Sequence, residues 1–258
     1  MVTYRYQSLE DYLISHPLNV DGVANDGWGG IFPVKGREIE ASVLFADISS
    51  FSSRTLELTS TETLAYVQNF FSWITAEALR DRPGIVDKYI GDEIMVVFSK
   101  EFGSTDPFVD ALQTARMFAE NDVHNFSPHM GIASGVVTVG YVGTPLRYNC
   151  SVFGAPVALA ARCASAKLTK VSSGGIVFPA KLWEGYKFED VFRPSTAGGS
   201  VGWEMHAPQK IEIKNMPDLD VIHVEKTTVH ISSWTAAERA KETIRGLEED
   251  GRYNPRYK

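Results

Sequence analysis

The run Ala41 to Ile48, with the sequence ASVLFADI, limits the possible folds more than any other segment. It is short and rich in Val, Leu, Phe and Ile, which is typical of a central strand covered on both faces rather than a strand exposed to water on one side. Its last residues carry an acidic side chain, Asp47. The segment therefore predicts a sheet with other elements packed on both sides and a carboxylate at the end of one central strand.

Two more strands are expected around a tight turn. The runs IVDKYI and EIMVVF flank the dipeptide Gly91-Asp92, which is a typical hairpin arrangement and displays Asp92 at the turn. The segment GIASGVVTVGYVG, residues 131 to 143, alternates small and β-branched residues and predicts a further strand pair. Residues 211 to 224, IEIKNMPDLDVIHV, predict a closing edge pair.

Helical patterns lie between these strands. Thr59 to Glu62 reads as a capping box that opens a helix, which Pro83-Gly84 ends. The predicted apolar stripe of this helix is Leu64, Val67, Phe70, Phe71, Ile74 and Ala78. A second amphipathic helix is expected over about 107–123, and a third over 157–168 with Arg162 in its middle.

The chain divides into three parts. Glycines and Pro33 interrupt any period in residues 1–35, which predicts an irregular N-terminal arm. Residues 36–225 form the predicted main domain. Residues 226–258 are a charged tail, helix-prone around 235–249, which predicts a surface or dimer-contact helix. With no internal repeat, the fold class expected is α+β in a single domain.

Charge and cysteine content exclude several function classes. The formal net charge of −7 argues against nucleic acid or an anionic membrane surface as the main partner. No apolar stretch approaches the roughly 18 residues of a membrane span, and the start lacks a signal-peptide pattern, so a cytoplasmic location is expected. Cys150 and Cys163 belong to no metal-binding spacing and are expected to be buried, reduced thiols.

Asp47 and Asp92 suggest a metal site. A strand beside the hairpin would bring both carboxylates to one rim, and oxygen ligands without His or Cys favour Mg²⁺ or Mn²⁺ over zinc. Two such ions could activate a hydroxyl and neutralise a leaving phosphate. The alternative is that each Asp simply caps backbone groups at a strand end or a turn.

Four sequence blocks resemble the successive signatures of the class III nucleotidyl cyclases. They are FADISSF (residues 45–51), KYIGDEIM (88–95), GIASGVVTVGYVG (131–143) and VFGAPVALAAR (152–162). The resemblance implies a mixed, mainly antiparallel sheet flanked by helices, and a head-to-tail homodimer with active sites across its interface. It also implies two divalent cations, Mn²⁺ or Mg²⁺, with Asp47 and Asp92 as ligands and the Ile48 carbonyl as a further ligand.

The same resemblance implies roles for three more residues. Lys88 matches the lysine that in purine cyclases reaches the base from the opposite protomer, and Ser151 occupies the base-reading position. Arg162 matches the arginine that stabilises charge on the α-phosphate during cyclisation. The alternatives are a solvated strand charge for Lys88 and an interface ion pair for Arg162. An arginine among Ala and Leu would otherwise bury a costly charge, which favours the functional interpretation.

The sequence departs from the purine cyclases at two positions. Ala158 stands where those enzymes usually have a ribose-contacting asparagine, and Ser151 replaces an Asp or Thr. These changes and the lead-in FPVKGRE resemble the bacterial pyrimidine cyclases of anti-phage signalling, the Pycsar cyclases. The resemblance implies a uridylate cyclase that converts UTP to cyclic UMP, which a separate effector reads. An adenylate cyclase, or a decayed module that binds nucleotide without turnover, are the alternatives.

Overall fold

The computed structural model describes residues 5–25, 30–80, 82–120, 122, 124–144, 147–166, 168, 175–192, 202–212, 218–227 and 234–255. The strands are β1 (Val20–Asn25), β2 (Ile31–Asp47), β3 (Gly84–Ile90), β4 (Glu93–Ser99), β5 (His129–Thr144), β6 (Arg147–Phe153), β7 (Gly175–Pro179), β8 (Gly202–Met205), β9 (Gln209–Ile211) and β10 (Leu219–Thr227). The α-helices are α1 (Leu9–Ile14), α2 (Phe51–Thr55), α3 (Ser60–Trp73), α4 (Pro107–Glu120), α5 (Ala155–Ala164), α6 (Phe188–Val191) and α7 (Ala236–Glu249). A π-helical turn, Ile74–Ala78, continues α3, and short 3₁₀ turns lie at Lys100–Phe102 and Ala180–Trp183.

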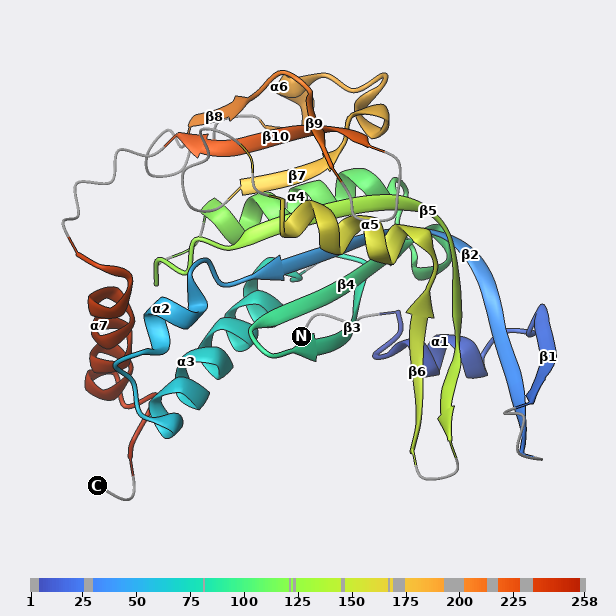
Figure 1. Cartoon of the computed structure of the whole chain (residues 1–258), viewed down its shortest axis with the longest axis horizontal. Coiled ribbons are helices and arrows are strands. Elements are labelled where there is room, and N and C mark those ends of the chain that lie inside the picture. Colours follow the sequence, from blue (N-terminus) through green and yellow to red (C-terminus); the bar gives the residue numbers. More distant parts are fainter. Residues whose placement is uncertain are drawn as a thin grey trace.

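The strands among the described residues form one mixed sheet (Figure 1). Its order is β3-β4-β2-β5-β7-β10-β8, with β1 paired to β2, β6 to β5, and β9 to β10. All neighbours are antiparallel except β5 and β7, which run parallel. This confirms the predicted mixed, mainly antiparallel sheet flanked by helices.

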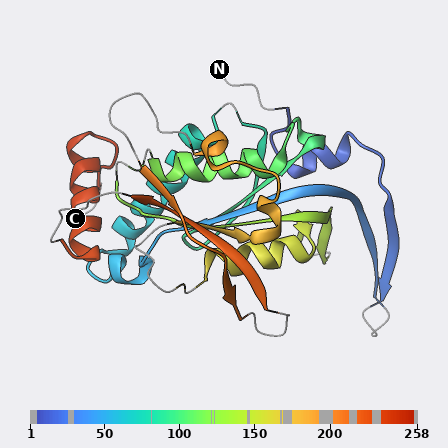
Figure 2. The same cartoon turned by 90° about the horizontal axis from the view of Figure 1, so that it is seen from above.

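The last part of strand β2, from Ala41 to Ala46, is buried on both faces, as its composition predicted. Leu44 and Ala46 face one core, shared with α3, α4 and α7. Val43 and Phe45, which alternate with them, face a second core that includes residues of α1 and α5. Seen from above, α4 and α5 lie on opposite sides of the sheet (Figure 2). Asp47 therefore ends a strand that two hydrophobic layers hold in place.

The second core is enclosed by a strong curl of the sheet. In the sheet, strand β6 pairs with β5, whereas β3 is the edge strand that pairs with β4 and is separated from β5 by β4 and β2. Ser151 of β6 nevertheless contacts side chains of β3. Leu9, Tyr12 and Leu13 of α1 pack into the space within this curl. The curl is what brings two non-adjacent strands together at the site described below.

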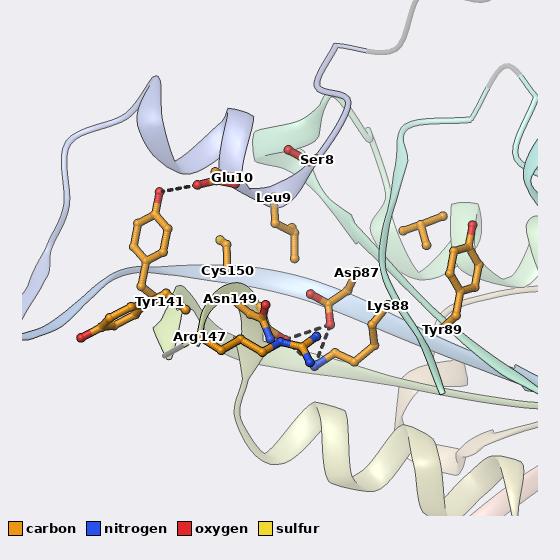
Figure 3. A pocket seen from close by; sticks show the side chains of 13 residues that line it. Ser8, Leu9, Glu10, Asp87, Lys88, Tyr89, Tyr141, Arg147, Asn149 and Cys150 are labelled. Atoms are coloured by element: carbon orange, nitrogen blue, oxygen red, sulfur yellow. Dashed lines mark hydrogen bonds and ion pairs between the residues drawn. The ribbon is translucent and has the colours of Figure 1, made fainter. Parts of the chain in front are cut away.

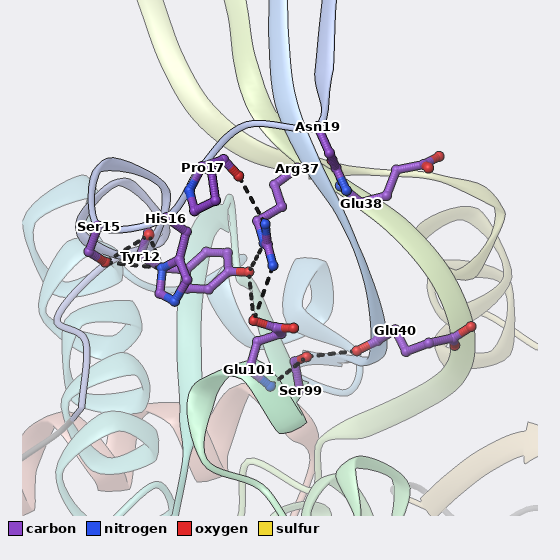
Figure 4. Close-up of polar contacts among 10 residues, drawn as sticks. All are labelled: Tyr12, Ser15, His16, Pro17, Asn19, Arg37, Glu38, Glu40, Ser99 and Glu101. Atoms are coloured by element: carbon purple, nitrogen blue, oxygen red, sulfur yellow. Dashed lines mark hydrogen bonds and ion pairs between the residues drawn. The ribbon is translucent and has the colours of Figure 1, made fainter.

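The N-terminal segment is more ordered than the sequence indicated. The prediction of an irregular segment over residues 1–35 missed α1, β1 and the start of β2. Tyr12 is fixed by a polar network in which Arg37 Nε donates to its hydroxyl at 2.9 Å, and that hydroxyl donates to Glu101 at 3.2 Å (Figure 4). Burial raises the pKa of Tyr12 to about 12. The periodicity of α1 was missed because six residues give too short a pattern.

The charged C-terminal helix also joins the core. Helix α7 begins at the predicted place, with a capping box between Thr235 and Glu238. Its Ala240, Ile244 and Leu247 are buried against the core that contains α3 and α4. Within the protomer this apolar side is covered, so it is not available as a free dimer-contact face, although the opposite charged side is exposed.

Several local predictions are confirmed and others are wrong. The Thr59–Glu62 capping box and the hairpin around Gly91-Asp92 are present. Leu64 is 69% exposed, so it does not belong to the buried stripe of α3. Residues 131–143 lie in one long strand, β5, rather than a strand pair. The strand pair predicted over residues 211–224 is present as β9 and β10, but β10 also pairs with β7 and is therefore not an edge strand. Residues 213–217 of that segment lie outside the described residues.

Across the described part of the chain, none of the helices combines the length and the apolar character needed to cross a bilayer.

Candidate functional site

Asp47 and Asp92 lie side by side at one end of the sheet. Asp47 ends β2 and pairs in register with Glu93, the residue after Asp92. Gly91 adopts a positive φ of 65°, which lets the β3–β4 turn close tightly. The Asp92 carboxylate accepts the backbone N–H of Ile48, directly after Asp47. The hairpin thus brings the two predicted metal ligands together.

The electrostatics of this acidic pair are unfavourable without a cation. Burial, followed by the charges of Asp92 and Glu93, raises the pKa of Asp47 to about 7. Burial also raises the pKa of Asp92 and of Glu93. Oδ1 of Asp47 is buried and has no hydrogen-bond partner in the described structure. Clustered carboxylate oxygens with an unpartnered buried acceptor fit a hard divalent cation such as Mg²⁺ or Mn²⁺.

Lys88 and Ser151 also meet, and a third residue joins them. Lys88 Nζ donates to Ser151 Oγ at 2.6 Å, and Ser151 Oγ donates to Asp87 Oδ2 at 2.9 Å. Lys88 Nζ lies 3.1 Å from the same Asp87 oxygen. The two predicted base-reading residues therefore come from one protomer. Asp87, which sequence reasoning missed, links them.

A β-bulge explains how two consecutive residues reach one hydroxyl. The register of β3 against β4 shifts between Val86 and Lys88. In a regular strand Asp87 and Lys88 would point to opposite faces, whereas an extra residue in the strand re-aims a side chain. The acid next to Lys88 was visible in the sequence, but the bulge that turns it toward Ser151 was not.

Asp87 is an unusually placed carboxylate. Its side chain is completely buried, and Oδ1 has no partner in the described structure. Burial raises its pKa, although Lys88 and Ser151 oppose that effect. Because the Ser151 hydroxyl donates its hydrogen bond to Asp87 and accepts one from Lys88, its oxygen can offer a ligand only its remaining acceptor position. In this arrangement the Ser151 hydroxyl does not donate to a carbonyl group of a base.

A cavity of about 500 Å³ opens beside these three residues (Figure 3). Its walls come from α1, β3, β5 and β6, and they include Arg147 and Asn149 as further hydrogen-bond donors. Ser8, Leu9 and Glu10 of the N-terminal segment complete the lining. The volume is suitable for a small polar ligand or part of a nucleotide. Arg147 and Asn149 carried no recognisable motif, so the sequence did not indicate them.

Helix α5 presents Arg162 to solvent. The helix packs closely on β5, where a Cβ on Gly131 would lie 2.1 Å from the carbonyl oxygen of Ala160. Arg162 and Ala158, four residues apart, are exposed on its outer side. The argument that Arg162 would bury a costly charge is therefore wrong within the protomer. No hydrogen bond or ion pair joins it to Asp47, Asp92 or Lys88 across the residues that the structure describes.

Comparison with known families gives a match over more than half of the chain. Residues 34–173 match the family model for the adenylate and guanylate cyclase catalytic domain. The uncharacterized protein Rv1320c of Mycobacterium tuberculosis is 32% identical over 136 residues, which cover 51% of this chain and 24% of that protein. Rv1319c from the same organism is 29% identical over the same length. The match spans only about a quarter of these relatives.

Solved structures share the fold at low sequence identity. The adenylyl cyclase CyaB from P. aeruginosa superimposes with a TM-score of 0.59 at 21% identity, covering 76% of this chain and 99% of that chain. The guanylyl cyclase Cya2 gives 0.51 at 22% identity, with 77% and 96% coverage. The guanylate cyclase domain of RhGC from Catenaria anguillulae, solved in complex with GTP, gives 0.52 at 18% identity, with 74% and 98% coverage.

Proposed function

The chain belongs to the adenylate and guanylate cyclase family, and we propose that it is a nucleotide cyclase that converts UTP to cyclic UMP and pyrophosphate. The observation that carries the substrate proposal is the cavity in which Lys88, Ser151 and Asp87 bond to one another beside Arg147. The acidic pair Asp47 and Asp92 provides the place for the triphosphate chemistry.

Asp47 and Asp92 would hold the cations, together with the Ile48 carbonyl. Two Mg²⁺ or Mn²⁺ ions, when bound, supply activation of the ribose 3′-hydroxyl and neutralisation of the triphosphate. The protein positions the ligands through the β3–β4 turn and the Asp92 bond to the Ile48 N–H. The carboxylates must both be ionised to do this, so cation binding and loss of the Asp47 proton are coupled.

The hydrogen-bond donors in the cavity favour a pyrimidine with carbonyl groups. Uracil has two carbonyl oxygens on either side of one N–H, while adenine has no carbonyl oxygen. Lys88 and Arg147 can each donate to a carbonyl, and the Ser151 oxygen, backed by Asp87, can accept the ring N–H. A pocket built on such bonds rejects a base that leaves them unpaired.

ATP is the second candidate because part of the pattern fits it. In adenine the ring nitrogen N1 accepts a hydrogen bond and the neighbouring amino group donates one. This acceptor–donor pair corresponds to a carbonyl and the adjacent ring N–H of uracil. Lys88 and Ser151 could therefore satisfy adenine between them, as in the resembled purine cyclases. Arg147 would then have no acceptor on the base. The discrimination in favour of UTP thus depends on the donors beyond Lys88.

A homodimer would complete the site. Arg162 is exposed on α5, so a second copy could receive its guanidinium opposite the α-phosphate. Val136 and Phe153, 52% and 40% exposed, lie on the strand pair next to the start of α5 and offer apolar surface for such a contact. A two-fold interface would give two equivalent composite sites.

The biological role proposed follows from the resemblance to the Pycsar cyclases. Cyclic UMP would act in the cytoplasm as a second messenger of anti-phage defence and bind a separate effector. This role rests on the lead-in FPVKGRE and on the changes at Ser151 and Ala158. It depends on the base preference and fails if the enzyme makes a purine product.

The test is an assay of the purified chain with UTP, CTP, ATP and GTP, each with Mn²⁺ and with Mg²⁺. Cyclic UMP as the main product supports the proposal. Cyclic AMP as the main product supports the second candidate. Tight binding of a nucleotide without cyclic product from any of the four would identify a decayed, nucleotide-sensing module. A variant with both Asp47 and Asp92 changed to Asn controls for contaminating cyclase.

A further inference from the structure

A second group of metal-binding side chains lies where β10 meets β8, at the opposite end of the sheet order from β3 (Figure 1). His223 and Glu225 are two apart on β10 and so share a face of the sheet. His206 directly follows β8, and its backbone N–H donates to the His223 carbonyl at 2.9 Å. The three potential ligand atoms lie within 4.8 Å of one another.

One ring nitrogen in the group is buried without a hydrogen-bond partner in the described structure. His223 is only 2% exposed, and its Nε2 atom makes no hydrogen bond in the described structure. A Cβ placed on Gly175 would come within 2.2 Å of this atom, so the ring can take this position only because residue 175 is glycine. A buried imidazole nitrogen without a partner is costly, and it requires an explanation.

The neighbouring contacts resemble a preformed ligand set. His206 Nε2 lies 2.7 Å from Glu225 Oε1, and the rings of His206 and His223 are nearly parallel with centroids 5.2 Å apart. A simple ion pair accounts for His206 and Glu225, but it leaves His223 unexplained. A cation between the three side chains would satisfy all of them after small rotations, since Zn–N and Zn–O distances are about 2.1 Å.

We propose that His206, His223 and Glu225 bind a first-row transition-metal cation, with Zn²⁺ the best fit. Two imidazoles and one carboxylate suit zinc, whereas Mg²⁺ prefers oxygen ligands. The site is therefore chemically distinct from the acidic pair of Asp47 and Asp92. It connects the end of β8 to β10, so the cation stabilises this side of the sheet.

The experiment measures zinc binding in a background without the acidic pair. The Asp47→Asn/Asp92→Asn protein is stripped with a chelator and titrated with Zn²⁺ against a chromophoric competitor. One equivalent should bind, and His206→Gln or Glu225→Gln should weaken it at least tenfold. His16→Gln, on α1's C-terminal side, is the matched control because it removes an imidazole elsewhere. Substitution with Co²⁺ should give the intense visible absorption of a tetrahedral site.

Thermal unfolding provides a second measurement that does not depend on enzyme activity. Zinc should raise the Tm of the background protein and of His16→Gln, because a ligand that binds the folded state stabilises it. Zinc should not raise the Tm of His206→Gln or Glu225→Gln. A cooperative unfolding transition of each variant without metal shows that the variant is folded. Absence of zinc binding to the background protein, or equal affinity in the site variants, would overturn the proposal.

Discussion

Lys88 and Ser151 form a 2.6 Å hydrogen bond across 63 residues of sequence, between strands that are not neighbours in the sheet. The curl of β5 and β6 over β3 makes this contact, and the bulge at Asp87 adds a buried carboxylate to it. The predicted substrate-binding residues thus form one bonded group. Its behaviour under mutation distinguishes a binding role from a merely structural one.

Asp87→Asn should impair substrate binding more than turnover. Without the carboxylate, the orientation of Lys88 and the direction of the Ser151 hydroxyl are both lost. We expect KM to rise roughly tenfold or more with a smaller change in kcat, as for loss of a buried charge-assisted bond. Steady-state kinetics with the preferred nucleotide measure this. A variant with normal KM, folded as judged by circular dichroism, would show that Asp87 only stabilises the strand.

Asp47→Asn should abolish cyclisation and stabilise the metal-free protein. Activity is lost because a metal ligand is replaced, and we expect a decrease of at least about 100-fold. The free energy of unfolding should rise by about 1 kcal/mol or more at pH 8, because an ionised carboxylate that burial and Asp92 disfavour is removed. Activity assays and denaturant unfolding test the two effects. Asp220→Asn, an exposed acid, is the control that should change neither.

The raised pKa of Asp47 should also make the thermal stability of the metal-free protein depend on pH. The folded protein holds the pKa of Asp47 at about 7, above the ordinary value of 3.8. A carboxyl with a raised folded pKa contributes stability that is present below the unfolded pKa and is lost as pH rises through the folded pKa. The metal-free Tm should therefore fall between about pH 4 and pH 7, and the fall should be smaller in Asp47→Asn.

Added Mn²⁺ should reverse this trend, since the cation binds the ionised form. The increase in Tm that Mn²⁺ produces should grow as the pH rises from about 6 to 8 and should be absent in Asp47→Asn. A pH-independent increase would argue against Asp47 as a ligand. Differential scanning calorimetry with and without a chelator supplies both curves.

Complementation tests the proposed exchange of Arg162 between subunits. Arg162→Ala and Asp47→Ala should each be inactive alone, whereas their mixture should regain activity because one site of the heterodimer contains no altered residue. Differently tagged chains, co-purified, prove that subunits exchange. If the co-purified heterodimer stays inactive, Arg162 and Asp47 serve the same protomer's site. An active Arg162→Ala homodimer would show instead that Arg162 has no role.

The parts that could be predicted from sequence are those with local patterns. The β2 run, the hairpin turn at Asp92 and the Thr59–Glu62 capping box each depend on a few adjacent residues, and all are present. The six-residue helix α1 has no comparable pattern, and its burial depends on the curl of distant strands. Residues 131–143 were predicted as a strand pair from their alternating small and β-branched residues, but this alternation continues through one strand, β5, within which Gly135 adopts a positive φ.

The residues of the candidate site also differ in whether a local sequence pattern indicates them. Asp47, Asp92 and Lys88 lie within recognisable blocks and Ser151 directly precedes one, and the structure joins them in two groups. Asp87 depends on a bulge, and Arg147 and Asn149 on the position of β6 against β3, which no local pattern encodes. The exposure of Arg162 was misjudged because neighbours in sequence do not indicate which side of α5 faces the sheet.

The base preference gives the sharpest test of the proposed function. UTP should have the highest kcat/KM, with CTP next and both purines at least about tenfold lower, because a site built on hydrogen bonds penalises a base that leaves them unpaired. Arg147 makes the prediction specific, since its donors fit the second carbonyl of uracil and have no acceptor on adenine. Arg147→Ala should therefore lower kcat/KM for UTP by about tenfold and change that for ATP much less. Arg245→Ala, on the exposed side of α7, is the matched control for loss of a guanidinium. Equal losses for UTP and ATP in Arg147→Ala would indicate that Arg147 contacts the phosphates or the ribose. In the unmodified enzyme, a kcat/KM for ATP equal to that for UTP would contradict the uridylate assignment while leaving the cyclase activity in place.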